Sequence, residues 1–182
     1  MMSSMRHNPG EEPDVRAYAV THPSGTVVIP QPHGWDQLLY ASHGVMSVHT
    51  RTGTWVVPPH RAVWVPSGTE HSIVMSGRVS VRTLYFAAGL ATLPQECRTV
   101  NVPALLRELI LYAAGLSPLY RRVAAHERLI GVILDQLAAL PAAPLQLPVP
   151  RDPRALRVAS ALMEDPAGAQ AEAALARAAG GS

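Results

Sequence analysis

Short runs of alternating apolar and polar residues fill the first half of the chain, from residue 15 to residue 86. A period of two is typical of β-strands that bury one face, and these runs are rich in Val, Thr, Tyr and Trp. Glycine and proline separate the runs at short intervals, which favours a sandwich or barrel over alternating strands and helices. The expected strands are Val15–Val20, Thr26–Ile29, Gln37–Ala41, Val45–Thr50, Thr54–Val57, Ala62–Val65, His71–Met75 and Val79–Phe86.

Two of the separators have the composition of tight hairpin turns. Arg51-Thr52-Gly53 lies between two β-rich runs, and Ser76-Gly77 lies between the last two expected strands. Glycine in such positions supplies the positive φ that short hairpin loops require. The sequence therefore predicts a chain reversal at each of these two places.

The spacing of apolar residues changes to a helical period after residue 100. Asn101 is expected to cap a first helix with Pro103 in its first turn, and Ser117-Pro118 is expected to end it. The second helix carries a wide apolar stripe of Val123, Leu129, Ile130, Ile133, Leu137 and Leu140. We expect a helical hairpin over residues 101–140 whose stripe pairs with a second copy of the chain across a two-fold axis.

Proline-rich and polar segments mark the expected boundaries. Residues 1–14 predict a flexible tail, and residues 15–100 predict the β-domain. Residues 141–150, PAAPLQLPVP, predict an extended linker. Beyond it, residues 151–182 predict further helices.

Composition narrows the classes of protein that the chain can belong to. The 182 residues are 48% hydrophobic and 15% charged, which is typical of one globular domain with a fragment of another. All 15 basic residues are arginines, and the net charge of the chain is only +2. A charge this small does not by itself indicate nucleic-acid binding. Cys97 is the only cysteine, no apolar run is long enough to span a bilayer, and the N-terminus lacks the apolar core of a secretory signal. We therefore expect a cytoplasmic protein without membrane contact.

Polar and aromatic residues at two places predict a ligand pocket. Gln31, His33, Trp35 and Gln37 fall on one face of an extended segment. Pro66-x-Gly68 predicts a turn, since proline fixes φ and glycine tolerates a positive φ, and this turn directs His71 inward. If the two segments face each other in a barrel, these side chains converge on one point.

The same residues resemble the two motifs of the cupin superfamily. The first motif is present as Gln31-x-His33-x(3)-Gln37, and the second as Pro66-Ser67-Gly68-Thr69-Glu70-His71. The segments QLLYASHGVMSVHTRTGTWVVPPHRAVWVPSGTEH, VRTLYF, LLRELIL and PLQLPVPRDPRALRVASALMEDP resemble the sensor domain of AraC-type transcription regulators. This resemblance implies a mainly β fold with C-terminal helices, namely a cupin-like double-stranded β-barrel (jelly roll) followed by a helical hairpin. It also implies a small-molecule effector and a homodimer.

The departures from the cupin pattern bear on metal binding. Gln31 and Gln37 stand where metal-binding cupins have His and Glu, and neutral amides are poor ligands for zinc or iron. His33 and His71 remain as possible ligands of a divalent metal, and the alternative is that both form hydrogen bonds within the barrel or to an effector.

Other aromatic residues and one arginine are candidates for the same pocket. Tyr85, Tyr40 and Trp64 suit stacking on a planar ligand, or ordinary core packing. Arg82 suits an anionic ligand or a structural ion pair.

The end of the sequence resembles the start of the AraC-type helix-turn-helix region. The resemblance begins near Arg151, and the recognition helix that would enter the major groove is not found before Ser182. Arg151, Arg154 and Arg157 recur every third residue and suit DNA-phosphate contacts or a solvated helix face. We expect a truncated DNA-binding domain, with promoter DNA bound only by a full-length relative.

Three functions stay open on this reasoning. The first is a ligand-sensing and dimerisation module of a transcription regulator, without catalysis. The second is a small metal-dependent cupin enzyme, such as a dioxygenase or isomerase. The third is a DNA-binding repressor that uses the remaining helices.

Overall fold

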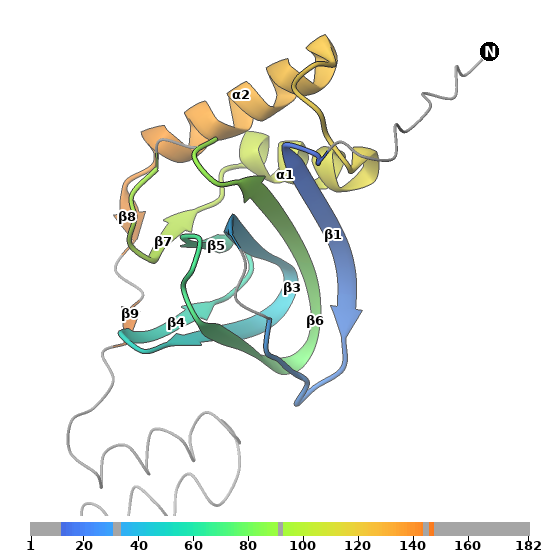
Figure 1. Ribbon diagram of the computed structural model, residues 1–182. Helices are drawn as coiled ribbons and strands as arrows, with labels where there is room; N and C mark the ends of the chain where they lie inside the picture. Colours follow the sequence, from blue (N-terminus) through green and yellow to red (C-terminus); the bar gives the residue numbers. More distant parts are fainter. Residues whose placement is uncertain (1–11, 31–33, 91–92, 144–145, 148–182) are drawn as a thin grey trace, which may run out of the picture.

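Nine strands and two helices make up the part of the chain that the computed structural model describes, residues 12–30, 34–90, 93–143 and 146–147. In chain order these are β1 (Val15–His22), β2 (Val27–Val28), β3 (Trp35–Thr50), β4 (Gly53–Val57), β5 (Arg61–Val65), β6 (His71–Ala87), β7 (Arg98–Asn101), α1 (Ala104–Leu116), α2 (Ala124–Ala139), β8 (Ala142–Ala143) and β9 (Gln146–Leu147). The predicted fold class is confirmed: an antiparallel, cupin-like jelly roll followed by two helices (Figure 1).

The longest strands, β3 and β6, form the centre of the sheet. They pair antiparallel along almost their whole lengths, from Trp35 opposite Ala87 to Thr50 opposite His71. The other edge of β6 carries β1 and β2, and the other edge of β3 carries β5 and β4. Because both central strands are bent, the sheet curls and its two ends approach each other around one interior.

The bend occurs where the sequence predicted separate strands. Gln37–Ala41 and Val45–Thr50 are parts of β3, and β6 continues through Gly77, so the predicted hairpin at Ser76-Gly77 is wrong. Register shifts surround His43, and Gly44 has a φ of +78°. A Cβ on Gly44 would lie 2.4 Å from the carbonyl oxygen of Arg78, so only glycine permits this close approach. The hairpin at Arg51 and Thr52 is confirmed, because Thr50 faces Gly53 across it.

Alternation along the strands produces two separate hydrophobic cores. One core lies in the barrel interior, where it borders on open space, with Leu39, Val63, Met75 and Val81 among its members. The other lies between the outer surface of the barrel and the two helices, and it contains most of the largest buried side chains. Its members include Leu38, Tyr40, Trp64, Leu84, Phe86, Leu106, Ile110, Leu119, Ile130 and Ile133.

The helices differ from the expectation in where they begin and in what they cover. Asn101 ends β7, and α1 begins at Ala104 without a side-chain cap, so the predicted cap is wrong. Both helices pack over the same side of the barrel (Figure 1). The apolar stripe of α2 faces the barrel: Ile133 is fully buried and Leu137 is 1% exposed. This stripe therefore stabilises the monomer and is not available to pair with a second copy, which corrects the predicted dimer contact.

Both segments that were predicted as independent of the β-domain contribute contacts to it. The carbonyl oxygen of Asp14, placed in the flexible tail, accepts a hydrogen bond from the backbone N–H of Ala87 at 2.9 Å. Within the predicted linker, β8 pairs with β7 and β9 pairs with β4. Neither helix in the described part of the chain is long and apolar enough to cross a membrane.

Candidate functional site

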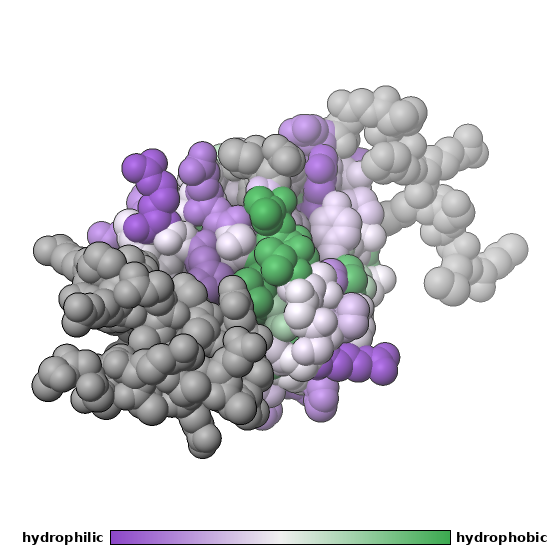
Figure 2. All heavy atoms as spheres, turned by 90° about the horizontal axis from the view of Figure 1, so that it is seen from below, coloured by the Kyte–Doolittle hydropathy of each residue, from purple (hydrophilic) through white to green (hydrophobic). Residues whose placement is uncertain are grey.

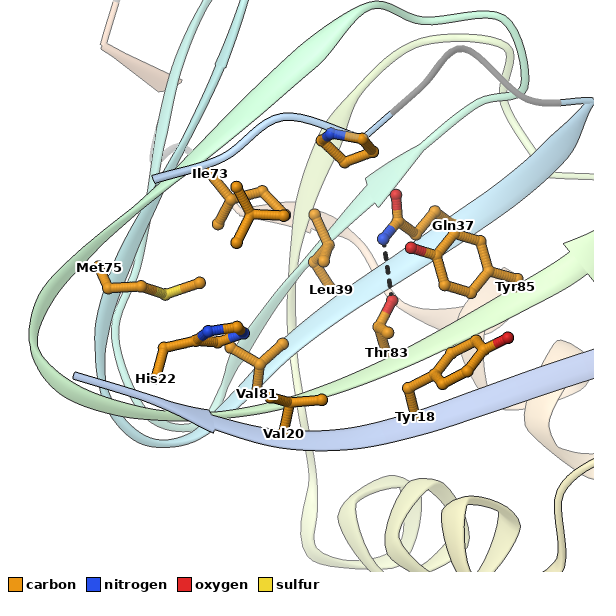
Figure 3. A pocket seen from close by; sticks show the side chains of 12 residues that line it. Tyr18, Val20, His22, Gln37, Leu39, Ile73, Met75, Val81, Thr83 and Tyr85 are labelled. Atoms are coloured by element: carbon orange, nitrogen blue, oxygen red, sulfur yellow. Dashed lines mark hydrogen bonds between the residues drawn. The ribbon is translucent and has the colours of Figure 1, made fainter. Parts of the chain in front are cut away.

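A cavity of about 320 Å³ lies inside the barrel, against the inner face of β1, β6 and β3 (Figure 3). Its volume is within the range of cavities that hold small organic ligands. The lining residues are Tyr18, Val20, His22, Val28, Pro30, Gln37, Leu39, Ile73, Met75, Val81, Thr83 and Tyr85.

The strand register explains how residues far apart in sequence come to line one cavity. Because side chains alternate across a strand, every second residue of β1, β6 and β3 projects to the same face. Three rows of facing residues result: Arg16–Tyr85–Gln37, Tyr18–Thr83–Leu39 and Val20–Val81–Ala41. The intervening residues of the same strands project into the core beneath the helices.

Gln37 is the polar centre of the cavity. The residue is only 1% exposed, and its Nε2 donates a hydrogen bond to Oγ1 of Thr83 at 3.0 Å. Its other amide atom, Oε1, is buried and has no hydrogen-bond partner among the described residues. A buried acceptor without a partner is costly, so it marks a place where a bound molecule can supply the missing donor.

Two tyrosines flank this amide. The rings of Tyr18 and Tyr85 meet edge to face, with centroids 5.8 Å apart and planes at 83°. Burial raises the pKa of the Tyr85 phenol above its usual 10.0, a hydrogen bond with Thr83 opposes this change, and the nearby charge of Tyr18 adds to it. The Tyr85 phenol is therefore neutral at physiological pH and can donate or accept a hydrogen bond.

The rest of the lining is apolar. It consists of aliphatic side chains, Pro30 and Met75, with His22 near the end of β1. None of the described residues that line the cavity carries a carboxylate, an ammonium or a guanidinium group.

Hydrophobic side chains are also exposed on the surface of the molecule. Val20, Val27 and Ile29 are 44%, 56% and 72% exposed. Figure 2 shows hydrophobic side chains gathered on the face of the molecule seen from below.

Of the residues predicted for the pocket, Gln37 and Tyr85 line the cavity, whereas Trp35 and His71 do not. Trp35 lies on the cavity face two residues before Gln37, but the guanidinium of Arg16 covers its ring at 4.7 Å. His71 is the first residue of β6, two residues before Ile73, and its Nδ1 donates a hydrogen bond to the carbonyl oxygen of Thr69 at 2.8 Å. Gln31 and His33 lie outside the described residues.

The predicted turn before His71 is present and is attached to the strand that carries Gln37. Gly68 has a φ of +74°, as the P-x-G pattern requires. Oδ1 of the buried Asp36 accepts a hydrogen bond from the backbone N–H of Ser67 at 2.8 Å. Within the described residues the two motifs therefore meet through Asp36, which projects away from the cavity.

The described donor set does not fit a metal ion. No group of three His, Cys, Asp or Glu side chains in the described residues comes together in a way that suits a metal. Gln37 is a neutral amide, which is a poor ligand for zinc or iron. Cys97 is also unsuited, because burial raises the pKa of its thiol to about 11, opposed by a hydrogen bond with Thr69. The predicted metal site at His33 and His71 stays a prediction.

Three further predicted candidates, Tyr40, Trp64 and Arg82, project away from the cavity. Tyr40 and Trp64 belong to the core beneath the helices, where Nε1 of Trp64 donates to the carbonyl oxygen of Pro94 at 3.1 Å. Arg82 alternates with the cavity residues of β6 and bonds to the backbone oxygen of Val81. The arginines at 151, 154 and 157 lie outside the described residues.

Sequence reasoning missed the contribution of β1. Tyr18, Val20 and His22 line the cavity, although only their alternation along Val15–His22 marked them as residues of one face. Thr83 was missed for a similar reason, because a threonine in a strand has no distinctive pattern. The pairing of Tyr18 with Thr83 across β1 and β6 was the signal required, and it is a tertiary feature.

Comparison with known proteins gives one family. The sequence model of the AraC-like ligand binding domain matches residues 12–179. The HTH-type transcriptional regulator NimR of Escherichia coli strain K12 is 34% identical over 160 residues, which cover 85% of this chain. The matched region is 58% of NimR, so the chain spans little more than half the length of this curated relative.

Solved structures with a similar fold include ToxT of Vibrio cholerae strain SCE256. Wild-type ToxT with a bound unsaturated fatty acid superposes with a TM-score of 0.54 over 74% of this chain and 56% of ToxT, at 8% identity. An apo form of a ToxT variant superposes with a TM-score of 0.52 over 69% of this chain and 55% of ToxT, also at 8% identity. At such low identity the likeness shows the fold alone.

Proposed function

This chain belongs to the AraC-like ligand-binding domain family, and we propose on that premise that it binds a small organic effector in its barrel cavity and signals the binding to transcription. The chain is thus expected to be the sensor part of a regulator and not an enzyme. Its curated relative NimR is named as a transcriptional regulator, and ToxT, which shares the fold, has been solved with an unsaturated fatty acid bound.

The observation that supports effector binding most strongly is the unpaired amide oxygen of Gln37 inside an apolar cavity. The interior of a domain is normally close-packed, and its buried polar atoms are paired. Here a cavity of about 320 Å³ and an unpaired acceptor occur together. A ligand that fills the space and donates to Oε1 removes both costs.

A cavity-filling variant tests this proposal. A panel of small organic molecules is titrated against the protein, and each hit is recorded as a rise in Tm, since binding to the folded state alone stabilises it. Val81→Trp places an indole in the cavity and should abolish the shift for every hit. The matched control Val132→Trp, on the exposed side of α2, should keep it. Shifts that persist in Val81→Trp would place binding elsewhere.

The proposal includes a homodimer. With the stripe of α2 buried, the exposed apolar residues of α1 are the better candidates for the contact. Leu105, Tyr112 and Leu116 are 55%, 62% and 38% exposed at spacings of seven and four residues, so they lie along one side of the helix. Light scattering after size exclusion should give a dimer, and Leu105→Glu should give a monomer. A wild-type monomer at high concentration would contradict the dimer.

The relay to transcription is the third part of the proposal. A transcription regulator acts in the cytoplasm of a bacterium, and promoter DNA is expected to be the partner of a full-length relative. We expect a full-length relative to bind promoter DNA and this chain alone not to bind it. A mobility-shift assay at physiological salt, with both proteins, tests this difference. Tight sequence-specific binding by this chain alone would contradict it.

A further inference from the structure

We propose that the effector is an uncharged, largely apolar molecule with one hydrogen-bond donor, and that Gln37 selects for that donor. This inference rests on the proposed function, since it defines which molecules the same cavity accepts. The volume sets the size: about 320 Å³ is roughly twice the ~150 Å³ apolar cavity known to hold a single benzene. The molecule therefore has about the size of two fused or linked rings.

The lining determines the charge of the ligand. An ion loses solvation where it lies against the apolar part of the lining, which disfavours carboxylates and ammonium ions alike, although Tyr18 and Val20 at the edge of the cavity are 50% and 44% exposed. Arg16 shares the cavity face, yet its guanidinium lies over Trp35 and within 4.0 Å of a carboxylate oxygen of Glu12. With this cation over Trp35, the described lining has no carboxylate, ammonium or guanidinium group, and the imidazole of His22 is the one side chain in it that can carry a positive charge.

The hydrogen bond between Gln37 and Thr83 orients the amide of Gln37 in the cavity. Nε2 of Gln37 donates to Oγ1 of Thr83 at 3.0 Å, and the threonine hydroxyl oxygen accepts this bond. In this orientation Oε1, an acceptor, is left for the ligand.

Selection for a donor follows from the unequal cost of the alternatives. A hydroxyl or N–H group on the ligand pairs with Oε1 of Gln37. A purely apolar ligand leaves that oxygen buried and unpaired, and a ligand oxygen that can only accept is repelled by it. The edge-to-face pair of Tyr18 and Tyr85 beside the amide adds a preference for a planar ring.

Three probes that share one ring system separate these effects. 1-Naphthol carries a donor, naphthalene carries none, and 1-naphthoate is anionic at neutral pH. Isothermal titration should show that naphthol binds and that naphthoate binds at least tenfold more weakly. In Gln37→Leu the ratio of naphthol affinity to naphthalene affinity should fall about tenfold, which corresponds to about 1.4 kcal/mol. The control Gln136→Leu, on α2, makes the same substitution outside the cavity and should keep the wild-type ratio.

A second variant guards against misfolding of Gln37→Leu. Thr83→Val keeps Gln37 but removes the hydroxyl that orients its amide, so the naphthol preference should fall while naphthalene affinity is retained. Naphthoate binding as tightly as naphthol, or a preference unchanged in Gln37→Leu, overturns this inference and leaves effector binding in the cavity intact. If Val81→Trp also fails to abolish binding of every hit from the panel, the proposed function falls with it.

Discussion

The two faces of the β1–β6–β3 sheet are built from the same strands but differ in how densely they are packed. Along β6, Leu84 and Phe86 project under the helices and are fully buried. Val81, Thr83 and Tyr85, which alternate with them, project into the barrel and line the cavity. One face is packed by side chains from both helices, and the other leaves space.

The comparison explains how one fold can provide both stability and the proposed binding. Dense packing beneath the helices supplies the free energy that holds the strands in place. The barrel face tolerates a cavity because its strands are already fixed from behind. The unpaired oxygen of Gln37 lies on the less well-packed face, which is the face where we propose that the effector binds.

The largest expected effect is the loss of an aromatic ring from the packed face. Phe86 is fully buried, with its ring centroid 5.7 Å from that of Trp64. Phe86→Ala should lower the free energy of unfolding by about 3–5 kcal/mol. Val81→Ala, on the cavity face, should lower it by only about 1–2 kcal/mol, since fewer atoms are removed and they border empty space. Denaturant unfolding measures both, and equal losses would abolish the distinction between the faces.

The next effect concerns the bend that creates both faces. Gly44→Ala should cost at least about 2 kcal/mol, since alanine at positive φ is strained by about 1–2 kcal/mol and its Cβ also meets the carbonyl oxygen of Arg78. Gly25→Ala has a similar φ but open space around its Cβ, and should show the strain alone. The same unfolding assay compares them. A Gly25 variant as damaging as the Gly44 variant would show that close approach of the strands is unimportant.

Enlarging a side chain should change the stability of the protein in opposite directions on the two faces. Leu84→Phe overfills the packed core and should cost about 1–3 kcal/mol. Val81→Leu extends into the cavity and should be neutral or stabilising by up to about 1 kcal/mol. Thermal unfolding of both variants reports the sign. Destabilisation by Val81→Leu would indicate that the cavity is smaller than the structure shows.

The smallest effect is a dependence of stability on alkaline pH through Tyr85. Its pKa is raised in the folded state, so the folded protein holds the phenol proton more tightly than the unfolded chain does. This contribution is complete below pH 10.0 and is lost as the pH rises from there through the folded pKa. The tyrosinate absorbance that is present in wild type and absent from Tyr85→Phe should titrate with a midpoint above 10.0. A midpoint below 10.0 would mean that the phenol of Tyr85 is exposed to solvent and that burial does not raise its pKa.

The sequence predicted the positions of the strands, turns and helices better than it predicted which strands pair with each other. The strand positions up to residue 87, the hairpin at Arg51 and Thr52, the turn at Gly68 and the two helices follow from local patterns of polarity and turn residues, whereas β7, β8 and β9 were not predicted. Ser76-Gly77 was misread because glycine at positive φ suits both a hairpin and a bend within a strand. Only the pairing of β3 with β6 distinguishes the two.

Alternation along a strand was enough to place two of the predicted pocket residues on the cavity face, whereas the position of His71 depends on contacts beyond the strand. Gln37 and Tyr85 were predicted from their types and positions, and they line the cavity. His71 was chosen by motif, but it lies beyond the end of the cavity that Ile73 lines. Its ring is held by a local bond to Thr69, which no pattern of spacing predicts.

The order of residues by itself determined which side chains share a face and where the chain turns, because both follow from backbone geometry over a few residues. The tertiary structure decided which face became the closed core and which became the cavity. That choice depends on the helices covering one side of the barrel, and on a register that brings Tyr18 and Gln37 to either side of Thr83 and Tyr85. Packing and register are set by contacts between distant segments, so they emerge only when the chain is folded.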